Sequence, residues 1–141
     1  MSLNVPLLRQ SFDLVAEANP KFISRFYDIL FTRYPQAKPL FARNARAQQE
    51  KMLTDALVAV LDHIESAPWL QSTLGGMGAK HVEYGVTTEM YGWVGESLLA
   101  TLAETAGPQW DAELNSAWTA AYQAISGLMI EGAKAAKGAN A

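Results

Sequence analysis

Apolar side chains recur at helical spacing along almost the whole chain, and prolines or glycines interrupt the pattern at intervals. In the first third, the spacing predicts helices over residues 4–18 and 20–33, with the proline at position 20 suited to a first helical turn. The Tyr34-Pro35 step ends the second helix, because the residue before a proline is driven out of helical geometry. A connector with two prolines follows.

The rest of the chain continues the same pattern. Four further helices are expected, over residues 46–65, 69–82, 89–106 and 109–134. Ser66-Ala67-Pro68 should end the first of these, and glycines at 75, 76 and 78 weaken the second. The small, polar tail from about 135 to 141 is expected to fray. Because no run alternates as a strand does, the pattern predicts an all-α protein with a single domain over residues 1–141.

Composition narrows the class of function. The net charge of -3 gives no electrostatic case for binding nucleic acid or an anionic membrane. The absence of cysteine excludes disulfides, thiolate metal sites and cysteine nucleophiles. The N-terminal segment resembles neither a signal peptide nor a membrane span, so we expect a cytoplasmic protein.

The side chains offer little reactive chemistry of their own. The sequence contains no glycine-rich phosphate loop and no nucleophile elbow, and its only histidines, His63 and His81, are eighteen residues apart. A lone histidine is usually an ordinary polar residue, which is our interpretation of His63. A single metal-ligand histidine in an all-α domain also suits haem, which brings its own metal and needs one imidazole. For His81 both interpretations remain open at this point.

Five ordered segments favour the second interpretation. FYDILFTRYPQAKPLF, QQEKML, KHVEYGV, MYGWVGESLLATL and AWTAAY resemble the globin family, in particular single-domain bacterial haemoglobins and the globin domain of flavohaemoglobins. The resemblance covers residues 4–132. It implies the globin fold, a three-over-three helical sandwich around haem b, which is iron protoporphyrin IX.

The resemblance also assigns roles on the distal side of the haem. Tyr27 matches the distal tyrosine, whose hydroxyl points at the bound ligand. Family spacing places the distal glutamine at Gln49, with Leu53 one turn later on the same helix face. Gln48 with Met52 is the alternative pair.

On the proximal side, His81 matches the histidine that binds the iron. Tyr91 matches a tyrosine that, in flavohaemoglobins, joins a hydrogen-bonded group with this histidine and a glutamate. Ala133 stands where that glutamate is expected, and Glu131 would face elsewhere on a helix. Losing the carboxylate weakens electron donation to the iron, which argues against peroxidase-like or oxygen-cleaving activity.

Five further haem contacts are implied by the resemblance: Phe41, Met77, Lys80, Val86 and Val94. Lys80 is the candidate partner for a haem propionate. Lys51 and Arg46 are the alternatives.

A tyrosine and a glutamine that both donate to bound oxygen imply high oxygen affinity, with nitric oxide and carbon monoxide as further ligands. The resemblance suggests nitric oxide dioxygenation, which would require an external reductase because we expect no reductase module in this chain. One alternative function is oxygen storage or delivery, or gas sensing without turnover. Another is a haem-free helical interaction protein or a bilin-binding relative.

Overall fold

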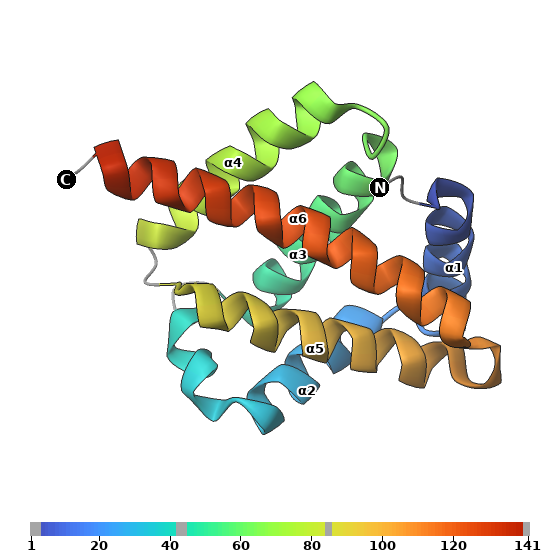
Figure 1. Cartoon of the computed structure of the whole chain (residues 1–141). Coiled ribbons are helices and arrows are strands. Elements are labelled where there is room, and N and C mark those ends of the chain that lie inside the picture. The colour runs from blue at the N-terminus through green and yellow to red at the C-terminus, as the bar shows by residue number, and fades with distance from the viewer. Residues whose placement is uncertain (1–3, 42–44, 84–85, 140–141) are drawn as a thin grey trace.

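The computed structural model describes residues 4–41, 45–83 and 86–139 (Figure 1). In chain order the elements are α1 (Val5–Ala18), α2 (Phe22–Arg33), the 3-10 helix η1 (Pro35–Phe41), α3 (Arg46–Asp62), α4 (Ala67–Glu83), α5 (Thr88–Ala106), the 3-10 helix η2 (Gly107–Gln109) and α6 (Ala112–Ala139). The described residues contain no β-strand, which confirms the expected all-α class. Within the same ranges, no helix combines the length and apolar character of a membrane span.

Several helix ends follow directly from local side-chain chemistry. The Asn4 side chain accepts a hydrogen bond from the Leu7 amide at 3.2 Å and so caps α1. The Asp111 carboxylate accepts one from the Leu114 amide at 2.8 Å and caps α6. At the end of α5, Gly107 has a positive φ of 59°, a conformation that glycine adopts readily.

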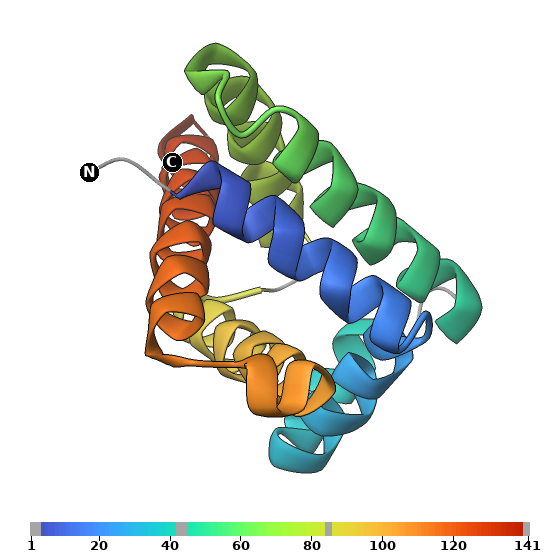
Figure 2. The same cartoon turned by 90° about the vertical axis from the view of Figure 1, so that its right-hand side faces the viewer.

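The helices are arranged three over three. Helices α1, α3 and α4 form one layer and cross over α2, α5 and α6 (Figures 1 and 2). The largest contacts between elements are made by α4 with α6 and by α2 with α5. The contact of α4 with α6 joins the two layers, and the contact of α2 with α5 lies within one layer.

The core lies where α1, α2, α5 and α6 meet. Leu30 of α2 and Leu102 of α5 are fully buried there. The indole N–H of Trp118 in α6 donates to the buried hydroxyl of Ser11 in α1 at 2.8 Å. The Ser11 hydroxyl in turn donates to the Leu7 carbonyl at 2.7 Å, so both buried polar groups are satisfied.

Glycines allow the backbones of α4 and α6 to come into contact. A Cβ atom added at Gly78 would overlap the Met129 carbonyl, and one added at Gly132 would overlap the Gly75 carbonyl. By contrast, a Cβ at Gly76 would meet nothing within 4 Å. Although these glycines lower intrinsic helix propensity, α4 is continuous, because Gly75 and Gly78 are packed directly against α6.

Several predicted helix boundaries were wrong. Helix α3 ends at Asp62, and Pro68 does not stop it but lies in the first turn of α4, where its missing N–H costs no hydrogen bond. Pro20 precedes α2 in a turn instead of starting the helix. Helix α6 starts at Ala112 and continues to Ala139, beyond the predicted end at 134, because its alanine- and lysine-rich end has high helix propensity. Fraying of that end in solution stays a prediction.

Candidate functional site

Tyr27 is the most deeply buried of the predicted site residues. Its side chain is 3% exposed and packs against the rings of Phe31 and Phe41, with centroid distances of 5.7 and 5.4 Å. The hydroxyl donates to the backbone carbonyl of Gln49 at 3.4 Å. Burial, assisted by the nearby negative charge of Glu50, raises the pKa of Tyr27 to about 12. The phenol is therefore a protonated hydrogen-bond donor at neutral pH.

The first turns of α3 bring Gln49 beside α2. Gln49 is half-buried and Gln48 is exposed. One turn later, Leu53 packs against the core, whereas the Met52 side chain is 44% exposed. This geometry favours the pair Gln49 and Leu53 over the pair Gln48 and Met52. A role for the Gln49 side-chain amide stays a prediction, since the contact with Tyr27 is made by the backbone.

His81 lies half-buried in the last turn of α4. Its Nδ1 atom is 2.6 Å from the Met77 carbonyl oxygen. A carbonyl oxygen can only accept, so Nδ1 carries the proton and, in the neutral imidazole, the lone pair lies on Nε2. Nε2 is then the nitrogen with which the ring would bind a metal. Beyond the helix, the Val86 amide donates to the His81 carbonyl at 3.0 Å.

Tyr91 packs beside His81 without the hydrogen bonding that the resemblance implied. The two ring centroids are 6.3 Å apart and the planes are tilted by 25°. Tyr91 is 8% exposed, and within the described residues its hydroxyl has no hydrogen-bond partner. Glu131 is exposed on α6, as expected from its position two residues short of Ala133. The hydrogen bond described for His81 Nδ1 is to a carbonyl, which donates less electron density than a carboxylate.

The other predicted haem contacts lie around these groups. Phe41, at the end of η1, meets the ring of Tyr27 edge-on with an interplanar angle of 73°. Val94 is half-buried against the core, and Val86 is half-buried just before α5. Lys80 is exposed on α4.

Arg46 and Lys51, the alternative partners for a propionate, both form ion pairs elsewhere. The Lys51 ammonium is 2.7 Å from the Asp55 carboxylate within α3. The Arg46 guanidinium turns towards α2, where it is 2.7 Å from the Asp28 carboxylate. The structure therefore favours neither residue as a partner for a propionate.

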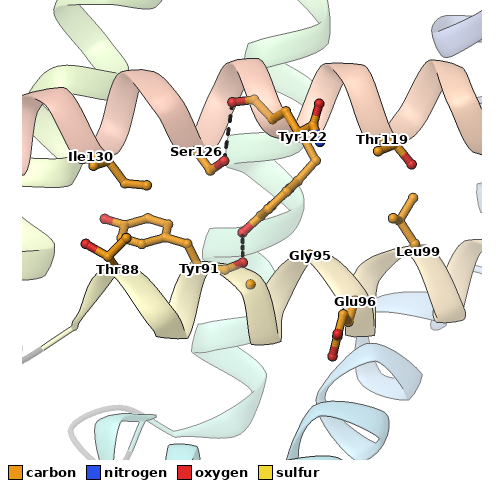
Figure 3. A pocket seen from close by; sticks show the side chains of 11 residues that line it. Thr88, Tyr91, Gly95, Glu96, Leu99, Thr119, Tyr122, Ser126 and Ile130 are labelled. Carbon is orange, nitrogen blue, oxygen red and sulfur yellow. Dashed lines mark hydrogen bonds between the residues drawn. The ribbon is translucent and has the colours of Figure 1, made fainter.

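A groove of about 300 Å³ runs between α5 and α6 (Figure 3). The ring of Tyr122 lies against Gly95, where an added Cβ would come within 2.6 Å of the ring. The Tyr122 hydroxyl donates to the Tyr91 carbonyl at 2.6 Å, and burial raises the pKa of Tyr122. Neither Tyr27 nor Gln49 lines this groove, so it is distinct from the group around Tyr27.

The available donor groups fit a haem. His81 offers the Nε2 atom of an imidazole whose Nδ1 is bonded to a carbonyl, and one imidazole is the single protein ligand that haem iron takes in many oxygen-binding proteins. Tyr27 offers a protonated hydroxyl in a largely aromatic environment. Among the described residues, no three His, Cys, Asp or Glu side chains converge as a metal-binding group.

Comparison with known proteins agrees with this assignment. The family model described as Globin matches residues 24–129. The chain is 29% identical over 126 residues to an uncharacterized globin-like protein from Aquifex aeolicus, covering 89% of this chain and 88% of that one. It is 28% identical over 130 residues to a flavohemoprotein from Vibrio cholerae, covering 91% of this chain and 33% of that one.

Among solved structures, the fold superposes on an engineered carbene transferase from Rhodothermus marinus, itself assigned provisionally as a nitric oxide dioxygenase. The TM-score is 0.82 at 26% identity, with 96% of this chain and 94% of that chain covered.

A three-over-three helical fold with a half-buried histidine on one side and a buried tyrosine on the other is typical of a helical haem-binding class. The family match covers well over half of the residues, and the chain belongs to the globin family. Membership implies a haem protein that binds gas ligands such as oxygen, and it confirms the predicted family and fold. The chain spans one third of the length of the Vibrio flavohemoprotein.

Two features of the site were not predicted from the sequence. The first is the contact of Arg46 with α2. The sequence indicated it only through the unusual position of a basic residue in the first turn of a helix, where the helix dipole disfavours a cation. The contact of Gly78 and Gly132 with opposite backbones had a signal too, namely glycines in the interiors of two helices.

Proposed function

We propose that the chain binds haem b through His81 and holds oxygen with Tyr27 and Gln49, which gives high oxygen affinity and slow release. The observation that carries this proposal is the buried Tyr27 hydroxyl, which is protonated at neutral pH. Its single proton, which the Gln49 carbonyl accepts at 3.4 Å, would turn to the bound ligand. When bound, the haem supplies an iron with one coordination position for a diatomic ligand.

The distal residues would favour oxygen over less polar ligands. A polar diatomic ligand would gain partial negative charge when bound in this pocket, and the Tyr27 O–H and the Gln49 amide would be the donors that stabilise such charge. Phe31 and Phe41 surround the phenol with apolar rings, and excluding water strengthens hydrogen bonds to charge. Carbon monoxide is much less polar, so it should gain less from the same donors.

We infer reversible binding of oxygen instead of its cleavage, because Ala133 stands where the resemblance expects the proximal glutamate. His81 Nδ1 donates to a backbone carbonyl, and the Tyr91 hydroxyl makes no hydrogen bond to it.

We further propose that the bound oxygen reacts with nitric oxide. Nitric oxide, oxygen and one electron balance to one nitrate ion, and the electron would come from a separate reductase in the cytoplasm. Support for this step comes from the Vibrio flavohemoprotein and from the Rhodothermus protein provisionally assigned this activity.

Multiple turnover with a reductase tests the proposal. The purified protein, supplemented with haemin, is first expected to give a haem absorption spectrum, and a colourless product would contradict haem binding. With NADH and a purified flavin reductase, it should then convert many equivalents of nitric oxide to nitrate in air. The reductase alone is the control. Nitrate production that stops after one equivalent would instead indicate oxygen storage, delivery or sensing.

A further inference from the structure

One arginine side chain connects the two helices that carry the proposed distal residues. The Arg46 Nη2 atom, on α3, donates to the Ser24 carbonyl at 2.6 Å and to the Asp28 carboxylate at 2.7 Å, both on α2. It also lies 3.3 Å from the Ser24 hydroxyl, while Nε donates to Glu50 of α3 at 2.9 Å. We propose that Arg46 is a positioning residue that clasps the first turn of α3 to α2 and thereby fixes the distance between Tyr27 and Gln49.

The sequence positions of these contacts support a role in spacing. Ser24 is three residues before Tyr27 and Asp28 is the residue after it, so both belong to the turns of α2 that carry the phenol. Gln49 follows Arg46 by three residues, within the next turn of α3. A single guanidinium therefore contacts both turns whose separation determines the 3.4 Å contact between Tyr27 and Gln49.

Local helix chemistry gives only a weak reason for an arginine at this position, namely the i,i+4 pair with Glu50. A cation in the first turn of a helix opposes the helix dipole. The N-cap residue Ala45 forms no side-chain capping bond, and the first turn contains no acidic residue. The contacts of Arg46 with α2 compensate for this local disadvantage.

Arginine suits this clasp better than lysine would. Its planar fork donates in several fixed directions at once, here to a carbonyl and to carboxylates on two helices. The pairs with Asp28 and Glu50 are exposed on one side, and exposed pairs contribute little to overall stability. The effect we infer is on geometry more than on the free energy of unfolding.

The effect of the Arg46 charge on the pKa of Tyr27 is consistent with the two side chains lying near each other. The charge of Arg46 lowers the pKa of Tyr27, in opposition to the larger effects of burial and of Glu50. The hydrogen bonds to Asp28 and Glu50 raise the pKa of Arg46, so the clasp stays charged over the neutral range.

The test compares variants of the haem-loaded protein, and it depends on the proposed oxygen site. In Arg46→Ala, we expect oxygen release to be about two- to fivefold faster, which is less than full loss of the Tyr27 hydrogen bond would give. The carbon monoxide stretching band should shift or broaden as the Tyr27 hydroxyl loses its fixed position. Arg46→Lys should give a smaller change in both. Lys51→Ala is the matched control, because its pair with Asp55 stays within α3, and it should change neither.

A double variant distinguishes positioning from general weakening. In a Tyr27→Phe background, Arg46→Ala should add little, because its effect passes through the phenol. Additive effects, or an Arg46→Ala protein identical to Lys51→Ala, would overturn the positioning role while Tyr27→Phe alone still changes oxygen release. An unchanged release rate in Tyr27→Phe would instead refute the proposed function.

Hydrogen exchange gives a second readout that does not depend on the bound gas. The amides of Gln48 and Gln49 donate to the Ala45 carbonyl in the first turn of α3. In Arg46→Ala these amides should exchange faster than in Lys51→Ala, and equal rates would contradict the clasp. If Arg46→Ala does not fold, the same comparison is made with Arg46→Lys.

Discussion

At the scale of single residues, the Tyr27 hydroxyl must stay protonated to donate a hydrogen bond. Its pKa, raised to about 12 by burial, places ionisation far above neutral pH. We expect the oxygen dissociation rate to be flat from about pH 6 to about pH 9 and to rise steeply only as the pH approaches that pKa. Above it, the phenolate cannot donate and its negative charge repels the polar ligand. A rate that rises already near pH 8 in stopped-flow mixing would contradict this description of the site.

The same raised pKa has a consequence for stability. The folded protein keeps the Tyr27 proton to a higher pH than the unfolded chain, whose tyrosines ionise near pH 10. Tyr27 therefore contributes fully below about pH 10, and its contribution is lost as the pH rises towards 12, at most about 2–3 kcal/mol. Urea denaturation should show a smaller loss over this range in Tyr27→Phe than in the parent. Some loss remains because burial also raises the pKa of Tyr122.

At the scale of helices, the contact between α4 and α6 separates two kinds of glycine. Gly78 and Gly132 face opposing backbone, whereas Gly76 and Gly127 face open space. Gly78→Ala and Gly132→Ala should each lower the free energy of unfolding by about 1–3 kcal/mol, because a methyl group forces the two backbones apart. Gly76→Ala and Gly127→Ala, one on each helix, should each raise it by about 0.5–1 kcal/mol through helix propensity.

Chemical denaturation of these four variants gives a direct comparison. The controls lie on the same helices and carry the same substitution, so only the space beside the Cβ differs. If Gly78→Ala and Gly76→Ala change stability in the same direction, the close approach of α4 and α6 is not as described.

Helix by helix, the sequence predicted most of the elements, because the apolar faces are regular. The five apolar residues spaced along α2, for example, are all buried in the structure. The ends of the helices were harder to predict than the helices themselves, and Pro68 shows the reason. Proline disfavours a preceding helix and also suits a first turn, so its position alone does not decide between an end and a start.

At the scale of the whole molecule, the site combines side chains from helices that are distant in sequence. Helical spacing could not place Tyr27 of α2 next to Gln49 of α3; that pairing came from the resemblance, and the contact is seen only in three dimensions. Arg46 was an alternative partner for a propionate in the sequence analysis, and its pair with the Asp28 carboxylate on α2 could not be predicted from a local pattern. The lack of a hydrogen-bond partner for the Tyr91 hydroxyl among the described residues likewise could not be predicted from the sequence.

The three-over-three arrangement gives the two sides of the site different supports. His81 is carried by α4, whose backbone is packed directly on α6. Tyr27 is carried by α2, which is packed on α5 and tied to α3 by Arg46. Substitutions at Gly78 should therefore affect the proximal side first, and substitutions at Arg46 the distal side.

The most direct test of the central claim is the oxygen dissociation rate of the haem-loaded Tyr27→Phe variant, measured by stopped flow beside the parent protein. Phenylalanine keeps the ring that packs against Phe31 and Phe41 and removes only the hydroxyl. Loss of a strong hydrogen bond to a partly charged ligand should speed release about tenfold or more. An unchanged dissociation rate would show that the Tyr27 hydroxyl does not hold the ligand.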